Sequence, residues 1–241
     1  MDEMGKKFDK TAKSNAITYI MVIVAWIVLM ALQQAGMLSS STVGLLVPVC
    51  IYSIMAVSLN LTVGILGDLS LGQAGFMCVG AFASAFFTNL VQDSITFTPL
   101  RFTLAILIGA LVAGLFGLLI GIPVLRLSGD YLAIVTLAFG EIIKNFLNIL
   151  YVGKDSHGLH FSIKDTMSLG MEPDGVVIIK GAQGITGTSK DATFTIGIIL
   201  LLISLFIVLR LIQSRDGRAI RSIRDNRIAA ESIGINITKY K

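Results

Sequence analysis

Six long apolar runs constrain this chain more than any other feature of its sequence. Each run is close to the ~20 residues that an α-helix needs to cross the hydrocarbon core of a bilayer. The runs are Ile17–Leu38, Val43–Leu66, Leu69–Val91, Phe102–Leu125, Tyr131–Tyr151 and Phe194–Leu211. Apolar residues make up 54% of the chain and charged residues only 14%, whereas soluble domains carry roughly 25% charged residues. The sequence therefore predicts an all-α polytopic integral membrane protein with about six transmembrane helices.

The basic residues indicate how such a bundle would be oriented. Lysines precede the first run, a cluster of basic residues follows the last, and Arg126 stands between the fourth and fifth runs. By the positive-inside rule both ends of the chain would be cytoplasmic, and residues 152–193 would form an external loop. The expected organisation is a cytoplasmic segment 1–16, a membrane domain 17–213 and a cytoplasmic segment 214–241.

The segment after the last run has the pattern of a helix, a break and a second short helix. Ile220 and Ile223 share one helical face, and continuing the same helix would place Arg227 between them. A break is therefore expected at Asp225-Asn226, both of which favour helix starts. The second helix would run over Arg227–Ile233.

Small residues mark the end of this second helix. Gly234 is expected to end it in the left-handed cap conformation. Ala229 and Ala230, together with Gly234, would leave a surface onto which another protein could settle closely. The alternative is an ordinary basic segment that only orients the chain in the membrane.

The stretch Gly64 to Phe82 is not expected to form a straight lipid-facing helix, because it carries five glycines and Asp68. A broken backbone at membrane depth must be buried in protein or line a cavity, which is typical of a translocation pathway. The alternative is a tight loop between two ordinary spans. The residues of this stretch that we expect along a pathway are Gly67, Ser70, Gly72, Gln73 and Gly75.

Glu141 and Lys144 are three residues apart, on one face of the fifth run and near its middle. Ionisable groups at that depth are costly, so they normally pair or face an aqueous pathway. The sequence leaves two interpretations open: a functional polar patch beside a substrate route, or an internal structural pair.

Motifs for catalysis are missing from the sequence. It contains no GxxxxGK[ST] phosphate-binding loop, no nucleophile elbow, no HExxH and no cysteine cluster. His157 and His160 lack a clearly placed third ligand, so no metal site is expected. We expect a chain that is not an enzyme, has no catalytic residues and no cofactor of its own, and binds no nucleic acid.

Three strings resemble the LivM-type permeases of branched-chain amino-acid importers that use ATP-binding-cassette ATPases. They are GDLSLGQAGFMCVGAF, GDYLAIVTLAFGEIIKNFLN and GRAIRSIRDNRIAAESIGINITKYK. Within the last string, Ala229-Ala230-x3-Gly234 resembles the Glu-Ala-Ala-x3-Gly loop with which such permeases grip their ATPase. Ile228 stands where that loop usually has glutamate, and Asp68 replaces a common glutamine in the first string.

The resemblance implies a role and a set of partners. It implies a permease subunit for leucine, isoleucine and valine in a bacterial or archaeal plasma membrane, with a LivH-like second permease, two cytoplasmic ATPase subunits that bind the ATP, and an external solute-binding protein. The residues it places in ATPase coupling are Gly217, Arg218, Arg221, Arg224, Ala229, Ala230, Glu231 and Gly234.

Other readings of the sequence stay open. Urea or short amides are alternative substrates in similar permeases, and a self-contained secondary transporter or channel, coupled through Glu141 and Lys144, is the rival class. A membrane-embedded enzyme is disfavoured. Because family members continue into further membrane helices, we also expect a C-terminally truncated permease whose segment Arg227–Lys241 is mobile.

Overall fold

The computed structural model describes residues 2–92, 95, 97–124, 127, 129–172, 175–185, 187–188 and 191–240, with side chains from residue 13 onward. Six helices in this part of the chain are long and apolar enough to cross a membrane. This confirms the polytopic helical fold. Arg126, which we expected on the cytoplasmic side, lies outside the described residues. The chain divides into two compact units, which are described separately.

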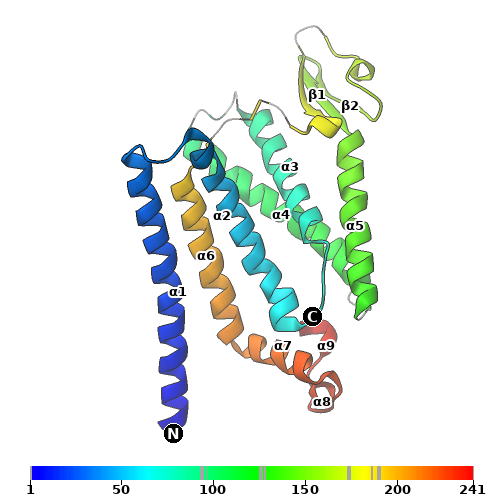
Figure 1. The fold of residues 1–241 in the computed structure, drawn as a ribbon. Helices are drawn as coiled ribbons and strands as arrows, with labels where there is room; N and C mark the ends of the chain where they lie inside the picture. The colour runs from blue at the N-terminus through cyan, green and yellow to red at the C-terminus, as the bar shows by residue number, and fades with distance from the viewer. Residues whose placement is uncertain are drawn as a thin grey trace. The chain divides into compact units, whose positions relative to one another are not determined.

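The first unit comprises Met1–Gly67 and Ala192–Lys241. Its long helices are α1 (Asp2–Gln34), α2 (Ser40–Asn60) and α6 (Phe194–Gln213), which lie side by side in Figure 1. A Cβ atom on Gly197 would lie 2.9 Å from the Cβ atom of Cys50, so this glycine lets α6 approach α2 closely. The core between these helices is formed by Leu46, Cys50, Phe194, Ile198 and Leu201.

The end of α2 departs from regular α-helical geometry. A π-helical turn, η1 (Leu61–Leu66), follows directly, and the N–H of Gly67 donates a hydrogen bond to the carbonyl of Thr62. Gly67 then takes a left-handed conformation with φ +82°, which glycine adopts without steric cost. The helix predicted over the second apolar run therefore stops at Leu66, and the chain continues without helix to Gln73.

Three short helices close this unit: α7 (Arg215–Asp225), α8 (Arg227–Ser232) and α9 (Ile237–Tyr240). The predicted break is confirmed, because Asn226 is extended and its side-chain oxygen accepts the N–H of Ala229 at 3.0 Å. Gly234 has φ +87°, which confirms the predicted left-handed cap.

The second unit, Asp68–Asp191, contains α3 (Gln73–Val91), α4 (Thr98–Val124) and α5 (Asp130–Ile149). Helix α3 packs against both α4 and α5. Its contact with α4 is close where two glycines meet, since a Cβ atom on Gly109 would lie 2.7 Å from the carbonyl oxygen of Gly80. Helix α3 begins at Gln73, four residues later than the apolar run predicted.

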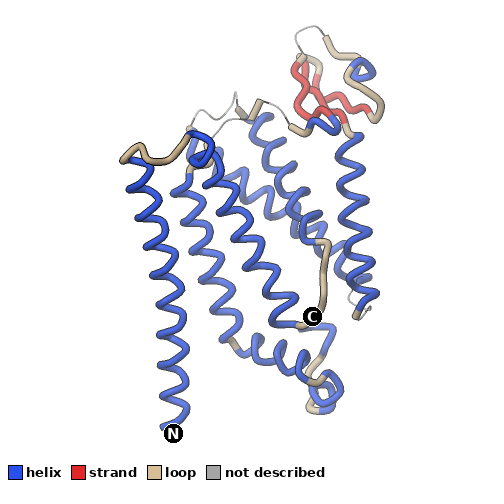
Figure 2. Tube along the Cα trace, viewed as in Figure 1, coloured by secondary structure: helices blue, strands red, loops and turns tan. Residues whose placement is uncertain are grey.

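A small antiparallel sheet follows α5, where the sequence analysis expected only a loop. Its strands are β1 (Tyr151–Asp155), β2 (Gly158–Ser162) and β3 (Val176–Lys180), in the order β2-β1-β3 (Figure 2). Two short 3-10 turns, η2 (Met167–Leu169) and η3 (Gly181–Gln183), flank β3. Val152, Ile178 and Ile179 are buried, and Phe82 and Phe86 of α3 pack against them. The all-α description therefore holds for the membrane helices and not for this segment.

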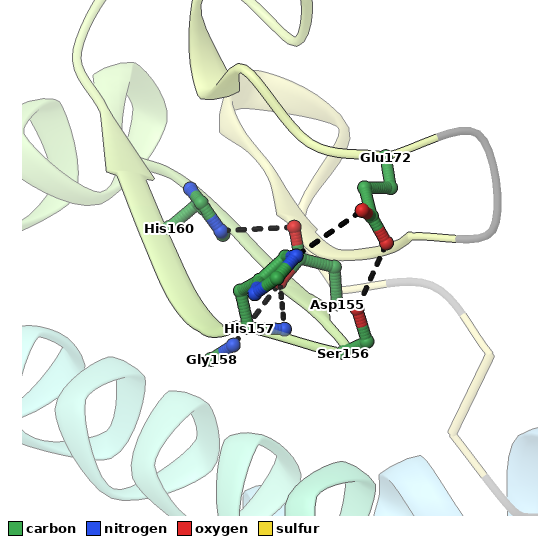
Figure 3. A network of polar contacts seen from close by, with 6 residues as sticks. All are labelled: Asp155, Ser156, His157, Gly158, His160 and Glu172. Atoms are coloured by element: carbon green, nitrogen blue, oxygen red, sulfur yellow. Dashed lines mark hydrogen bonds and ion pairs between the residues drawn. The ribbon is translucent and has the colours of Figure 1, made fainter.

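Paired side chains stabilise the turn between β1 and β2, as Figure 3 shows. The Asp155 carboxylate accepts the N–H groups of His157 and Gly158 at 2.8 and 3.0 Å, and it lies 2.9 Å from Nε2 of His160. His157 Nε2 lies 3.1 Å from Oε1 of Glu172. Each histidine thus contacts its own carboxylate, and among the described residues no group of three acidic, histidine or cysteine side chains could hold a metal ion.

Candidate substrate cavity and coupling segment

A cavity of about 290 Å³ opens between α3 and α5 in the second unit. Three of the residues predicted along a pathway, Gly75, Glu141 and Lys144, line it together, although Gly75 lies far from the other two in sequence. The remaining lining is mainly apolar and consists of Leu71, Ala74, Met77, Cys78, Leu137 and Gly140.

Glycine shapes this cavity by bringing the two helices together. A Cβ atom on Gly75 would lie 2.9 Å from the Cα atom of Gly140, so any larger residue there would push α3 from α5. A Cβ atom on Gly72 would lie 2.7 Å from the carbonyl oxygen of Thr136. The chain entering α3 therefore lies directly on the backbone of α5.

The Thr136 hydroxyl accepts a hydrogen bond from the non-helical backbone that leads into α3. The N–H of Leu71, just before α3, donates to Thr136 Oγ1 at 3.1 Å, and Thr136 is buried. A backbone N–H outside regular secondary structure must find such a partner when it is away from water. The non-helical segment is thus packed against protein, as a pathway segment would be.

Glu141 and Lys144 form an ion pair on the open side of the cavity. Lys144 Nζ lies 3.2 Å from Oε2 of Glu141, and the side chains are 60% and 54% exposed in this chain. A pair this exposed contributes little stability in water. Facing lipid it would be costly, so this face of α5 is suited to water or to another protein.

The other predicted pathway residues do not line the cavity. Gly67 belongs to the first unit, where it is exposed and the side chain of Arg224 lies close to it. Ser70 is half-buried in the non-helical segment, and Gln73 is the first residue of α3.

Three of the four arginines of α7 bind the ends of membrane helices. Arg218 Nη1 donates to the carbonyl of Gln213 at 3.2 Å, and Arg221 Nη2 donates to the carbonyl of Ile212 at 2.9 Å. Arg224 Nη1 donates to the carbonyl of Gly64 at 2.9 Å. The last carbonyls of a helix lack partners within the helix, so these guanidinium groups cap α6 and η1 from outside.

Gly217 allows α7 to turn back tightly under α6. It is buried, and a Cβ atom there would lie 2.5 Å from the carbonyl oxygen of Ile212, with the carbonyl of Leu211 closer still. Ser214 fixes the same turn, because its hydroxyl accepts the N–H of Gly217 at 3.1 Å. This predicted coupling residue therefore sets the position of α7.

Ala230 requires a correction. We expected it on a small-residue surface open to another protein, but it is 2% exposed and packs against Ile223 and Ile237. The fold turns α9 back over this face of α8, a contact that the local pattern does not reveal. Ala229, Glu231 and Gly234 are exposed as expected.

Two exposed isoleucines, which the sequence analysis did not select, dominate the free surface of α8 instead. Ile228 is 79% exposed and Ile233 is 75% exposed. Their signal in the sequence is a large apolar residue near each end of a short helix whose other residues are small or polar. Exposed apolar residues on a helix whose other face packs against the protein are suited to contact with a partner.

These features define a polytopic membrane protein with a partly charged cavity between two of its helices. The family model described as "Branched-chain amino acid transport system / permease component" matches residues 41–241, and the chain belongs to this family. Its members are transporter components, in agreement with the resemblance found in the three sequence strings.

Two curated relatives carry the description "High-affinity branched-chain amino acid transport system permease protein LivM". The chain is 30% identical to the one from Salmonella typhimurium over 246 residues, and 31% identical to the one from Escherichia coli K12 over 247 residues. Each alignment covers 98% of this chain and 56% of the relative, so the chain spans about half the length of these relatives. No solved structure matches the chain.

Proposed function

We propose that this chain is a membrane-spanning subunit of an importer for leucine, isoleucine and valine. The family supports the transport class, and the names of the two relatives support the substrates. The observation that carries the proposal is the Glu141–Lys144 pair on the wall of the cavity. An amino acid carries one charge of each sign, and this pair offers the complementary charges to its ammonium and carboxylate groups.

The apolar part of the same cavity suits the side chain of such a substrate. Leu71, Met77 and Leu137 line it beside the charged pair. A branched aliphatic side chain gains free energy from burial against such a surface. A smaller solute without an aliphatic side chain, such as urea, would leave most of the apolar lining without a partner.

ATP hydrolysis would be supplied by two separate ATPase subunits, which bind the nucleotide. Helix α8 offers them Ile228 and Ile233, with Ala229, Glu231 and Gly234 around them, while α7 braces α8 against the membrane helices. A LivH-like second permease would cover the exposed face of Glu141 and Lys144, leaving the route between the two subunits. An external solute-binding protein would deliver the substrate.

The basic residues at both ends of the chain give the proposed orientation. With these ends in the cytoplasm of a bacterium or archaeon, α7 and α8 meet the ATPases there and the sheet β1–β3 lies outside. The chain itself is then a non-enzymatic component that opens the substrate route alternately to either side of the membrane.

The reactivity of the two native cysteines tests whether substrate enters the cavity. Cys78 lines it, whereas Cys50 is 2% exposed in the core of the first unit. In the assembled importer, a charged methanethiosulfonate should modify Cys78, leucine should slow that reaction, and Cys50 should not react. Glu141→Gln should lower uptake while the protein stays in the membrane. Leucine-independent labelling, together with normal uptake in Glu141→Gln and Lys144→Ala, would remove the cavity from the pathway.

Reconstituted vesicles test the energy source. Leucine accumulation should require the ATPase subunits and ATP inside the same vesicles, and should be lost when either is withheld. Accumulation driven by an ion gradient without the ATPases would identify a secondary transporter instead.

A further inference from the structure

The regular pattern of helical hydrogen bonds stops at the end of α2. A backbone carbonyl there is available to a partner outside the helix. The π-helical turn η1 ends at Leu66, and Gly64 provides one of its last carbonyls. Carbonyls at a helix end need partners from outside the helix. Interruptions of this kind often occur at functional positions in membrane helices.

Arg224 of α7 supplies that partner and lies on the neighbouring glycine. Its Nη1 donates to the carbonyl of Gly64 at 2.9 Å, while Nε and Nη2 contact Oδ1 of Asp225 at 3.2 and 3.1 Å. A Cβ atom on Gly67 would lie 2.6 Å from Cγ of Arg224. The guanidinium is therefore oriented by Asp225, and the aliphatic stem lies close to the left-handed residue at which the helix stops.

Helix α7 thus connects the ends of two membrane helices. Arg218 and Arg221 bind carbonyls at the end of α6, whereas Arg224 binds η1 at the end of α2. A displacement of α7 would be passed to η1 through Arg224. Gly67 is also the last residue of the first unit before the chain enters the segment leading to α3.

We propose that Arg224 is the positioning residue through which movement of α7 and α8 reaches the interrupted end of α2 and the conformation of Gly67. The inference rests on the proposed function, since it gives ATPase docking at α8 a physical connection to the backbone that leads toward the cavity. It assigns Arg224 a role inside the chain, distinct from attracting an ATPase by charge.

Hydrogen exchange tests the connection independently of transport. In the purified importer, Arg224→Ala should speed amide exchange in a peptide covering residues 61–67 by about tenfold, the effect of losing one hydrogen bond to a charged group. Arg215→Ala is the matched control, because it removes an exposed arginine at the start of the same helix that was not assigned to coupling, and it should leave this peptide unchanged. If Arg224→Ala assembles poorly, the milder Arg224→Lys should show the same change at smaller size.

The second measurement is the coupling between substrate and ATP hydrolysis. Arg224→Ala should reduce the ratio of substrate-stimulated to basal ATP hydrolysis by roughly fivefold while the ATPases still co-purify, and Arg215→Ala should retain the wild-type ratio. Gly67→Ala should lower the hydrolysis ratio more in the wild-type chain than in the Arg224→Ala chain. The added methyl group meets Cγ of Arg224 in the first chain, and the second chain lacks that atom.

Unchanged exchange in residues 61–67, or faster exchange with a wild-type hydrolysis ratio, overturns the proposal. Equal effects of Arg224→Ala and Arg215→Ala would show that only the loss of a positive charge matters, and would overturn the proposal as well. A wild-type importer whose hydrolysis does not respond to leucine would contradict the proposed function, and the exchange experiment alone would then decide whether Arg224 positions Gly67.

Discussion

Thr136 in the middle of the second unit accepts a hydrogen bond from the backbone of Leu71, 65 residues earlier in the chain. The same hydroxyl contacts the carbonyls of Leu132 and Ala133 on its own helix. One side chain therefore holds the segment that enters α3 against α5, beside the cavity.

Removing that hydroxyl should leave the Leu71 N–H without its acceptor. We expect Thr136→Val, which keeps the shape of the side chain, to lower the free energy of unfolding by about 1–3 kcal/mol. Thr136→Ser keeps the hydroxyl and should cost less. Thermal unfolding of the purified chain in detergent measures both, and equal losses would show that packing rather than the hydrogen bond matters.

Gly217 should not tolerate a methyl group. The added Cβ atom meets backbone carbonyls at the end of α6, which cannot move aside as a flexible side chain could. Gly217→Ala should therefore cost about 1–3 kcal/mol and release α7 from α6, despite the better helix propensity of alanine. Gly114→Ala in α4, where nothing lies within 4 Å, is the control and should be neutral. Similar unfolding temperatures for the two variants would contradict this prediction.

The free surface of α8 and its buried face should respond differently to substitution. Ile228→Lys replaces an exposed apolar residue with a charged one, so the chain should fold normally but fail to co-purify with the ATPase subunits. Ala230→Trp inserts an indole among Ile223, Ile237 and their neighbours, and should destabilise the whole segment first. Limited proteolysis separates the two effects. A stable Ala230→Trp segment that merely loses the ATPase would return Ala230 to the docking surface.

Acid should loosen the turn between β1 and β2. Burial alone would raise the pKa of Asp155, but hydrogen bonds from the His157 backbone and the His160 ring outweigh it and hold the pKa below its usual 3.8. The stabilisation is therefore present above the usual value and is lost as the pH falls through the lowered pKa. Amide exchange in residues 151–162, corrected for its intrinsic pH dependence, should accelerate as the pH falls below about 4. Asp155→Asn should remove this acid transition, and an identical transition in that variant would assign it to another group.

Buried Arg101, near the start of α4, forms an ion pair with half-buried Asp191, with Nη2 and Oδ2 3.0 Å apart. Removing one member leaves the other charge buried, so Arg101→Met should lower the unfolding temperature by about 10 °C. The double variant Arg101→Met, Asp191→Leu should recover much of that loss. Lys144→Ala breaks the exposed pair on α5 and should change the unfolding temperature of the isolated chain little. A double variant that is no more stable than Arg101→Met would show that other contacts of Arg101 dominate.

The sequence by itself determined the features that depend on neighbouring residues. Apolar runs of membrane-spanning length specified six helices, because backbone groups in lipid can be satisfied only within a helix or a closed barrel. Arg227 after the Ile220–Ile223 stripe located the break at Asn226, and the need for a left-handed cap identified Gly234. Glu141 and Lys144 were found together because they are one helical turn apart.

Only the tertiary structure decided which distant residues meet. Strand β3 pairs with β1 across the intervening loop, so the run Val176–Ile179 could be recognised as a strand only once its partner was known. The burial of Ala230, the carbonyl bound by Arg224, and the cavity shared by Gly75 and Glu141 all depend on contacts between separate segments. The physical reason is that helical periodicity gives a residue its direction around its own axis, whereas the atoms it meets there are set by how the other helices pack.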